Sequence, residues 1–271
     1  MITDKMRIGL VGCGNIGADL CIALQKGDIP AELVALTDID PERANMFIRT
    51  FHLNAKPGAL DETVAAADFI VECAHADAVG DVIKAVIRHR KPCLIMSVAG
   101  LLSHPDLLEQ AREQSVRVQL PSGAICGLDG IRSAMQAGLH SVTLTTRKPP
   151  GGLKGAPYLA EKGIDLDNLR EPLVVFEGIA LDAAKAFPQN VNVAAALSLA
   201  GVGPLDTLVR VVADPHATTN SHEIEAEGAF GRLSTVTENL PSPRNPKSSY
   251  LASLSAVAEL RASPEAFVSQ G

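Results

Sequence analysis

The stretch MRIGLVGCGNIGADLCIAL, residues 6–24, decides the fold of the first part of the chain. Its apolar run, residues 8–11, predicts a short buried strand, and Gly12, Gly14 and Gly17 follow in the spacing G-x-G-x-x-G. Apolar residues then recur at helical intervals. A strand, a glycine-rich turn and a helix in this order are typical of the first unit of a dinucleotide-binding domain.

Each glycine in this spacing has a physical purpose. Gly12 permits a tight turn, Gly14 lets the backbone approach a pyrophosphate, and Gly17 lets the helix pack closely on the strand. The first helical turn, with Asn15 and Ile16, offers amide groups and the positive end of the helix dipole to phosphate. We expect all five residues to contact a dinucleotide. The alternative is a glycine turn that binds none.

An acidic residue ends the next predicted strand, as the dinucleotide fingerprint requires. This is Asp38, which closes the run ELVALTD at residues 32–38. Its carboxylate would bind the adenosine ribose and favour NAD over NADP, because a 2′-phosphate would meet its charge. Arg43 lies close enough in sequence to weaken this discrimination, so the expected cofactor is NAD or NADP. Asp38 could instead cap the following helix, although Asp40, directly before Pro41, is the better candidate.

The alternation of strands and helices continues to Pro121. Strands are predicted at residues 67–74, 92–98 and 116–121, and helices at residues 76–89 and 104–114. This pattern predicts an α/β domain, residues 1–121, with the doubly wound parallel sheet of the Rossmann fold. His75 falls at a strand end, where it would contact the cofactor or lie exposed in a loop.

The rhythm changes after Pro121. A strand at residues 141–147 and helices at 180–188 and 192–201 precede three closely spaced strands, residues 206–214, 220–228 and 232–240. Short connections between successive strands predict a mainly antiparallel sheet, and hence a second, α+β domain over residues 122–244. We expect the remaining segment, residues 245–271, to contain a helix that packs back on the first domain.

One strand of the second domain carries an unexpected residue. Within residues 220–228, the glutamates alternate with His222, Ile224 and Ala226, so a histidine begins the face that should be packed. Histidine suits proton transfer because its unperturbed pKa lies close to neutral pH. A core histidine bonded to a backbone carbonyl explains the pattern equally well.

Composition excludes several classes of function. The 271 residues carry a formal net charge of -7, with aromatic residues at 3% and no Trp, which argues against nucleic-acid binding. The chain shows no apolar leader or membrane-spanning run, so we expect a cytoplasmic protein without membrane contact. The five cysteines form no C-x-x-C pair and are expected to be buried thiols, Cys126 included. No metal-ligand spacing is present, and no metal is expected.

Several blocks of the sequence resemble the L-aspartate dehydrogenase family over nearly the whole chain. The glycine fingerprint is common to many dehydrogenases, whereas the later blocks are far more specific. They read GLVGCGNIG, PSGAICGLDG, TLTTRKPP, VFEGIALDAAKAFPQNVNVAAALSLAG, VVADPHATTNSHEI, GAFG and ENLPSPRNPKSSYLA.

The resemblance implies an activity and several site residues. Members of the family oxidise L-aspartate to iminoaspartate with NAD or NADP, and the imine hydrolyses to oxaloacetate and ammonia or feeds NAD biosynthesis. His222 matches the catalytic histidine, and Ala124 and Asn192 match cofactor contacts. Asn190 and Asn192 could also cap the helix that follows. The family further suggests a homodimer.

The two carboxylates of aspartate require cationic or hydroxyl donors. Arg147 and Lys148 at a strand end are the first candidates. Lys247 is the second, followed by Ser248 and Ser249 as hydroxyl donors. Arg147 or Lys148 could equally be exposed strand-end charges. Lys247, which we place early in a helix, is expected to be exposed to solvent. Because a cation is electrostatically disfavoured at a helix N-terminus, the alternative is that it binds an anion.

Two other classes of function fit the sequence less well. One is a different two-domain NAD(P)-dependent reductase, such as a relative of dihydrodipicolinate reductase or homoserine dehydrogenase. The other is an NAD-sensing protein without turnover, although no basic recognition module accompanies the nucleotide domain.

Overall fold

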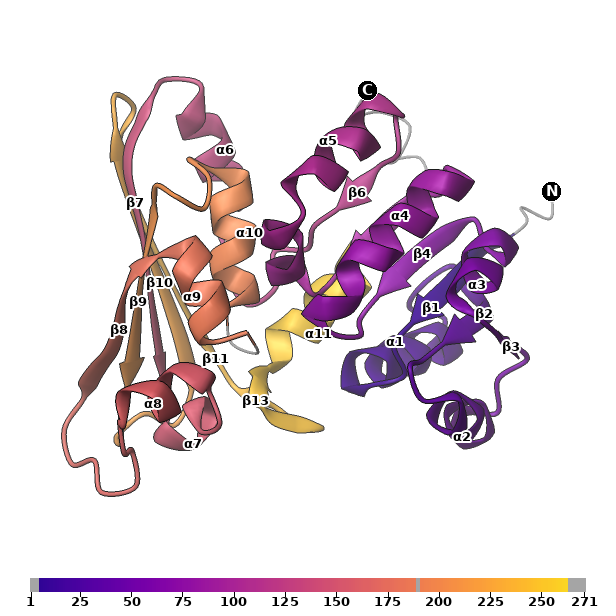
Figure 1. Cartoon of the computed structure of the whole chain (residues 1–271), viewed down its shortest axis with the longest axis horizontal. Helices are drawn as coiled ribbons and strands as arrows, with labels where there is room; N and C mark the ends of the chain where they lie inside the picture. Colours follow the sequence, from indigo (N-terminus) through magenta and orange to yellow (C-terminus); the bar gives the residue numbers. More distant parts are fainter. Residues whose placement is uncertain (1–4, 189–190, 263–271) are drawn as a thin grey trace. The chain divides into compact units, whose positions relative to one another are not determined.

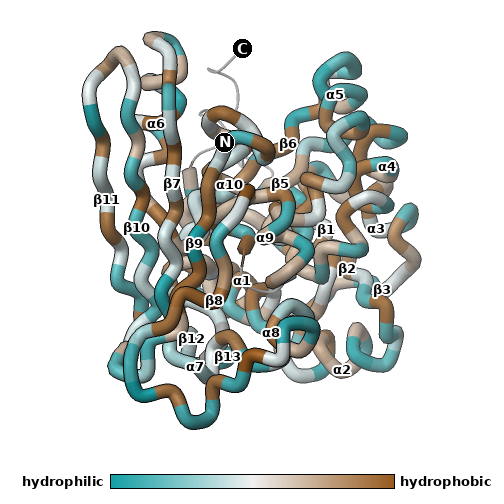
Figure 2. The backbone as a smooth tube through the Cα atoms, turned by 60° about the vertical axis from the view of Figure 1, so that its left-hand side comes forward, coloured by the Kyte–Doolittle hydropathy of each residue, from teal (hydrophilic) through white to brown (hydrophobic). Residues whose placement is uncertain are grey.

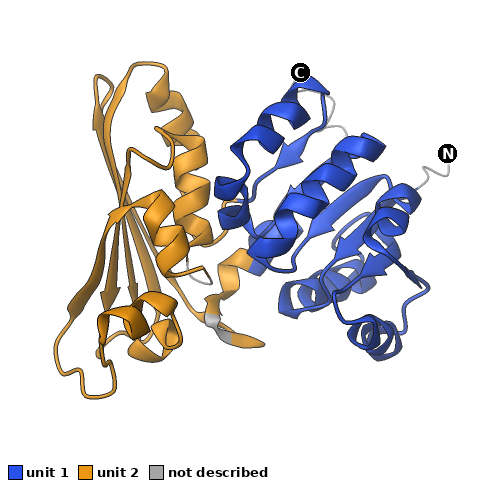
Figure 3. Ribbon diagram, viewed as in Figure 1, with its two compact units in different colours: residues 1–121, 253–271 blue, residues 122–252 orange. Residues whose placement is uncertain are grey.

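The computed structural model describes residues 5–188 and 191–262. The chain forms two compact units (Figure 3). Unit 1 comprises the chain up to Pro121 together with the segment from Ser253 onward, and unit 2 comprises Ser122–Ala252. The main boundary therefore falls directly after Pro121, and the chain enters unit 1 again within its last helix.

Unit 1 contains a six-stranded sheet in the order β3-β2-β1-β4-β5-β6 (Figure 1). All neighbouring strands of this sheet pair parallel, which confirms the predicted doubly wound Rossmann sheet. Its strands are β1 (Met6–Val11), β2 (Ala31–Thr37), β3 (Lys56–Pro57), β4 (Phe69–Glu72), β5 (Cys93–Ile95) and β6 (Val118–Gln119). Its helices include α1 (Asn15–Lys26), α2 (Pro41–Phe51), α3 (Leu60–Ala66), α4 (Val79–His89) and α5 (Pro105–Glu113), with short 3-10 turns at Ala76–Ala78 and Val98–Ser103.

The local sequence explains where the first helices begin and end. Helix α1 ends at Gly27, whose left-handed conformation (φ 78°) lets its N–H bond the carbonyls of Ala23 and Leu24. Helix α2 begins after Asp40, whose side chain accepts a hydrogen bond from the Glu42 N–H. Asp40 is therefore the cap of α2, and Asp38 is not.

The last helix, α11 (Tyr250–Arg261), belongs partly to the core of unit 1. Ala256 and Leu260 are 0% and 1% exposed and pack in one apolar cluster with Ile8 and Leu10 of β1 and residues of α1 and α2. On the other face of β1, a Cβ at Gly9 would meet Ile70 and the α3 segment at 2.8–3.1 Å. Helices thus cover both faces of the parallel sheet.

Unit 2 contains a five-stranded sheet in the order β11-β10-β7-β9-β8. All four predicted strands are present, but successive strands are not all neighbours in the sheet, as their short connections had suggested. Strand β7 lies between β9 and β10 and runs parallel to β9, so the sheet is mixed. The short β9–β10 connection can still cross one strand, because two strand spacings amount to only about 10 Å. The strands are β7 (Leu139–Lys148), β8 (Leu173–Ile179), β9 (Thr207–Ala213), β10 (Asn220–Gly228) and β11 (Gly231–Asn239).

Strand β8 was not predicted, and the segment before α11 was predicted wrongly. Asn245–Ser249 forms strand β13, which pairs antiparallel with β12 (Pro241–Ser242), and the helix begins only at Tyr250. Lys247 therefore lies in a strand, and the electrostatic argument from a helix N-terminus does not apply to it. The remaining helices of unit 2 are α6 (Leu128–Met135), α7 (Pro150–Leu153), α8 (Pro157–Lys162), α9 (Ala180–Ala186) and α10 (Asn192–Ala200).

The five-stranded sheet has one packed face, which we call the inward face. Strand β10 places His222, Ile224 and Ala226 there with 2%, 0% and 1% exposure, as its alternation predicts. Figure 2 shows hydrophilic and hydrophobic positions following one another along β10 and β11. Helices α9 and α10 pack against strands β8 and β9 on one side of the sheet (Figure 1).

Four of the five cysteines are buried, and burial raises the pKa of the Cys13 and Cys21 thiols to about 12. Cys126 is exposed, so its predicted burial is wrong. It lies in the turn that leads into α6, directly before the left-handed Gly127. Among the described residues, no helix is long and apolar enough to cross a membrane.

Candidate active site

A group of polar side chains lies at one end of the inward face of unit 2. Strands β7 and β10 pair so that His222 is opposite Thr146 and Ser221 is opposite Arg147. This register brings Asn220 beside Lys148, and a Cβ at Gly152 would lie 3.6 Å from the Lys148 Cβ and 3.9 Å from the Asn220 Oδ1. We call the buried residues Thr146, Lys148, Asn220, His222 and Ser249 the polar cluster.

Hydrogen bonds connect members of this polar cluster. The His222 Nδ1 lies 3.1 Å from the Thr146 Oγ1, and both side chains are buried. The Asn220 Nδ2 donates to the Ser249 Oγ at 3.3 Å. Buried polar groups are costly unless they are bonded, so such a concentration points to a functional site.

Burial shapes the charges of this cluster. It lowers the pKa of Lys148 to about 8, so the ammonium is still the main form at neutral pH. Burial, and then the nearby Lys148 charge, lower the pKa of His222 to about 3. The imidazole is therefore neutral at physiological pH. A buried cation beside a neutral imidazole favours an anionic ligand.

Ala124 is held next to this cluster by strand β11. Its carbonyl oxygen accepts hydrogen bonds from the Thr237 Oγ1 at 2.8 Å and the Asn239 Nδ2 at 3.0 Å. Thr237 is opposite His222 in the sheet. Since both lone pairs of the carbonyl are engaged, a cofactor contact by Ala124 would use its N–H.

Other predicted substrate-binding residues do not join the cluster. Arg147 lies on the other face of β7, where its Nη1 pairs with the Asp214 Oδ2 at 2.9 Å. The Ser248 hydroxyl accepts from the Asn245 Nδ2 at 2.9 Å. The Lys247 side chain lies outside the described residues. The structure therefore places Lys148 on the same face as His222, whereas Arg147 lies on the opposite face.

The predicted cofactor residue Asn192 is the first residue of α10 and is half-buried. Asn190, the other asparagine of this block, lies outside the described residues. Val191 stands at the N-cap position of α10 and makes no side-chain capping bond. Asn192 is therefore not the cap of this helix.

Sequence reasoning missed several members of the site. Thr146 and Asn220 complete the polar cluster, to which Ser249 of the second candidate set also belongs, and Thr237 and Asn239 fix Ala124. A signal for the first two was present, because both share the strand face of a residue already singled out. The contributions of Ser249, Thr237 and Asn239 depend on pairings between distant segments, which alternation within a strand does not reveal.

Unit 1 contains a cavity of about 620 Å³ at the carboxyl ends of β1, β2 and β4. Gly12, Gly14 and Asp38 line it, together with Ile39, Arg43 and His75. His75 is exposed, and its Nδ1 lies 3.2 Å from the Asp77 Oδ2, so the structure places it in a loop that faces this cavity.

The glycine turn meets the requirements of a dinucleotide site. Gly12 has φ +100°, and a Cβ there would lie 2.6 Å from the Ala74 backbone. At Gly17 a Cβ would lie 2.9 Å from the Gly12 carbonyl oxygen, which is too close. Nothing lies within 4 Å of a Cβ at Gly14, so the backbone there is open to a ligand. Helix α1 has no side-chain cap and no acid in its first turn, which suits phosphate.

Two carboxylates hold the walls of this cavity. The Asp38 Oδ2 accepts from the Cys13 N–H at 2.8 Å, and its Oδ1 accepts from the Asp40 N–H at 3.0 Å. Glu72, 0% exposed, accepts from the N–H groups of Ala74 and Ser97 at 2.8 and 2.9 Å. Burial raises the pKa of Glu72, while these hydrogen bonds oppose the shift. Glu72 thereby fixes the loops that follow β4 and β5.

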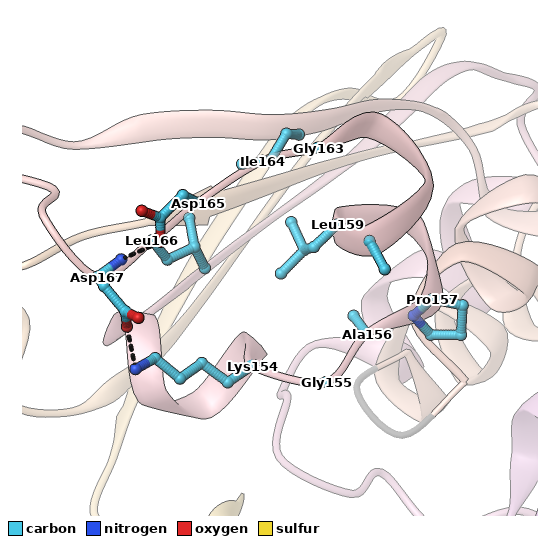
Figure 4. Close-up of a pocket in the computed structure, with 11 residues that line it drawn as sticks. Lys154, Gly155, Ala156, Pro157, Leu159, Gly163, Ile164, Asp165, Leu166 and Asp167 are labelled. Carbon is cyan, nitrogen blue, oxygen red and sulfur yellow. Dashed lines mark hydrogen bonds and ion pairs between the residues drawn. The ribbon is translucent and has the colours of Figure 1, made fainter.

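A second cavity, of about 550 Å³, lies within residues 154–167 of unit 2. Figure 4 shows the Lys154–Asp167 ion pair at its rim and Leu159 directed toward its interior. None of the predicted site residues lines it. Among the described residues, no group of three or more His, Cys, Asp or Glu side chains could hold a metal ion.

A parallel Rossmann sheet with a glycine turn, followed by a second domain with a mixed sheet, defines the class of the protein: a two-domain dehydrogenase that uses a pyridine nucleotide. Family profiles support this class. Residues 12–121 match the NAD-binding domain of homoserine dehydrogenase, and residues 129–263 match the C-terminal domain of aspartate dehydrogenase.

Comparison with whole proteins defines the family. The L-aspartate dehydrogenase of Methanosarcina mazei is 46% identical over 262 residues, which cover 94% of this chain and 96% of the relative. That of Bradyrhizobium diazoefficiens is 41% identical and covers 96% and 92%. The crystal structure of aspartate dehydrogenase from Thermotoga maritima is 25% identical, with a TM-score of 0.70 and coverage of 95% and 96%. The chain belongs to the L-aspartate dehydrogenase family.

We predict that His222 makes the protein less stable in acid. Its pKa is about 6.5 in the unfolded chain and about 3 in the folded one, so the unfolded state binds more protons between these values. The free energy of unfolding should therefore fall as the pH drops from 6.5 toward 3, by up to about 1.4 kcal/mol per pH unit. Urea unfolding at several pH values measures this slope.

The control is His222→Gln, which lacks the titrating ring. Lys148 is protonated in both folded and unfolded states over this window, because its pKa shift acts between about 8 and 10.5. The variant should show the shallower slope. Equal slopes for the parent and the variant would contradict the burial of a neutral imidazole.

Proposed function

We propose that the protein catalyses the NAD(P)-dependent oxidative deamination of L-aspartate to iminoaspartate, with His222 as the acid–base residue. The observation that carries this proposal is a buried neutral imidazole beside the buried Lys148 cation on the inward face of unit 2. Membership of the L-aspartate dehydrogenase family supplies the substrate class.

The chemistry requires a base at the substrate nitrogen. The pyridine nucleotide, when bound, accepts a hydride from the α-carbon. The nitrogen lone pair must be free to form the C=N bond, so the substrate ammonium first gives a proton to the chain. His222 supports this role through its Nε2, because its Nδ1 is engaged by Thr146. Water then hydrolyses the imine to oxaloacetate and ammonia.

The charge of the substrate strengthens this base. Without an anion, burial and the Lys148 charge hold the pKa of His222 near 3, and the ring is a weak proton acceptor. A carboxylate beside Lys148 would offset the cation and raise the His222 pKa toward its ordinary value. The base therefore becomes effective when an anionic substrate is bound.

Lys148 is our candidate for holding a substrate carboxylate. It lies on the same face as His222, whereas Arg147 faces the opposite side and pairs with Asp214. The Asn220 amide and the Ser249 hydroxyl lie beside it as further donors. Lys247 and Ser248 remain predictions without support from the side-chain contacts of the described residues.

The finer features of the cofactor site also remain proposals. Asp38 would bind the adenosine ribose and favour NAD, and Arg43 at the same cavity would allow some use of NADP. Asn15 and Ile16 would present first-turn amides to the phosphates. Ala124 would contact the cofactor through its N–H, and Asn192 would contact it from the start of α10.

A homodimer is supported by the outward face of the five-stranded sheet. Val174, Leu208 and Val236 share this face and are 50%, 48% and 56% exposed. Large exposed apolar side chains on a sheet face suit contact with a second copy of the chain. The cytoplasmic location and the link to NAD biosynthesis stay predictions from the sequence.

We predict that His222→Ala still binds the cofactor but loses turnover. General acid–base catalysis contributes on the order of 10²- to 10⁴-fold, so kcat with L-aspartate should fall by at least about 100-fold. Initial rates of NADH or NADPH formation measure kcat, and nucleotide fluorescence measures binding. The matched control is His216→Ala, which removes an exposed histidine from the same unit. A variant as active as the parent would make His222 structural.

Lys148→Met should raise KM for L-aspartate by roughly 10- to 100-fold, because a charge-assisted hydrogen bond contributes about 1.5–3 kcal/mol. In the parent, kcat/KM should decline above about pH 8 as Lys148 loses its proton. The variant should lack that decline. Arg147→Met tests the rejected candidate and should keep KM near the parent value. If only Arg147→Met raises KM, the assignment is reversed.

Asp38→Ala should narrow the preference for NAD over NADP by about tenfold, or roughly 1.4 kcal/mol. Its carboxylate would no longer repel a 2′-phosphate or bind the ribose hydroxyls. The ratio of kcat/KM values for the two cofactors measures the effect. Asp40→Ala removes only the helix cap and should leave the ratio unchanged. An unaltered ratio in Asp38→Ala would remove Asp38 from the ribose site.

A further inference from the structure

Thr146 makes a buried side-chain hydrogen bond that bears on the chemistry of His222. It is opposite His222 in the β7–β10 ladder, is 3% exposed, and places its Oγ1 3.1 Å from the His222 Nδ1. At this distance one of the two groups donates a hydrogen to the other. A hydroxyl can do either, whereas a neutral imidazole carries its proton on only one nitrogen. The direction of this bond therefore determines the tautomer of His222.

The two tautomers differ in what they can do. If Nδ1–H donates to the Thr146 Oγ1, the Nε2 keeps its lone pair and can accept a proton. If the hydroxyl donates to Nδ1, the proton of the neutral ring is on Nε2, which then cannot act as a base. Because Nδ1 is already engaged inside the sheet, Nε2 is the nitrogen through which His222 would meet a substrate amine.

We infer that Thr146 is a positioning residue, which accepts the His222 Nδ1–H and so keeps the Nε2 lone pair available to the substrate. The inference rests on the proposed acid–base role of His222. When Nε2 takes the substrate proton, Nδ1–H stays where it is. The same hydrogen bond therefore holds the ring before and after the transfer.

The position of Thr146 suits this task. The preceding residues on the same face, Val142 and Leu144, are aliphatic and 1% and 0% exposed, so a hydroxyl in this row is a departure from the apolar pattern. Threonine fits a strand as well as valine does, and its branched side chain has few rotamers. The oxygen is thus held in place at little entropic cost. Burying it would be unfavourable without a partner, and His222 supplies one.

The test compares variants that differ by one atom or one strand position. Thr146→Val keeps the shape and removes the hydroxyl, and Thr146→Ser keeps the hydroxyl. The matched control is Thr145→Val, which changes the preceding residue of β7, on the outward face. Nitrogen-15 NMR of histidine-labelled protein shows which ring nitrogen carries the proton. His222→Ala identifies the His222 signals among those of the seven histidines.

We expect the parent, Thr146→Ser and Thr145→Val to have His222 protonated on Nδ1. In Thr146→Val the proton should move wholly or partly to Nε2. Its kcat with L-aspartate should fall roughly 10- to 100-fold while KM stays within about threefold, because substrate binding keeps its partners and proton transfer loses its acceptor. Thr146→Ser should recover most of kcat.

Two results would overturn the inference: a parent spectrum with the proton on Nε2, or a Thr146→Val protein that keeps the parent tautomer. The parent spectrum alone decides the question if Thr146→Val does not fold. Failure of the proposed function looks different, because the parent would then form no NADH or NADPH from L-aspartate, or His222→Ala would keep its rate. The tautomer is read independently of either activity.

Discussion

The antiparallel pairing of β7 with β10 is the constraint on which the polar cluster depends. Its register sets Thr146 opposite His222 and brings Lys148 to the same face. A slip of one residue would exchange the two faces, because side chains alternate along a strand. A slip of β10 would turn Ser221 inward and the imidazole out of the core, and a slip of β7 would put Arg147 in the place of Lys148. The aliphatic residues lower on the same strands, Leu144 and Ile224, prevent this slip because they must stay buried. The packing of the sheet thus fixes the relative positions of Thr146, Lys148 and His222.

The cavity of unit 1 is shaped mainly by close approaches of the backbone. The closeness of Gly12 to the Ala74 backbone, and of Gly17 to the Gly12 carbonyl, leaves room for no other residue type. Glu72 connects the loops after β4 and β5 through backbone amides, although a buried carboxylate is unfavourable by itself. These bonds make the cavity wall a single connected structure. The side chains proposed for catalysis come instead from unit 2, where a sheet can present them on a packed face.

Much of this could be predicted from the sequence, for identifiable reasons. The parallel sheet follows from a glycine motif with strands and helices in a fixed order, and the burial of His222 follows from alternation within one strand. The insertion of β7 between β9 and β10 could not be predicted, because short connections suggest neighbours but do not prove pairing. A helix start was predicted at Lys247 because Asn and Ser are common helix caps, whereas the strand depends on pairing with β12, which local sequence does not reveal. Arg147 and Lys148 were equal candidates until the register separated them, and that register depends on a partner strand distant in sequence.

The polar cluster is unfavourable to the folded protein alone. Burial disfavours the charged forms of both Lys148 and His222, and their proximity adds repulsion whenever the ring is protonated. The aliphatic packing around them must offset this cost. An anion at Lys148 reverses the situation, since it pairs with the cation and removes part of what suppresses the basicity of His222. In the proposed mechanism, substrate binding recovers the energy that weakens the empty fold, and the substrate carboxylate arrives at the moment when a base is needed. The proposed role of Thr146 complements this effect. The charges of Lys148 and of its bound anion set the pKa of His222, and the hydrogen bond from Nδ1 to Thr146 sets Nε2 as the nitrogen that receives the proton.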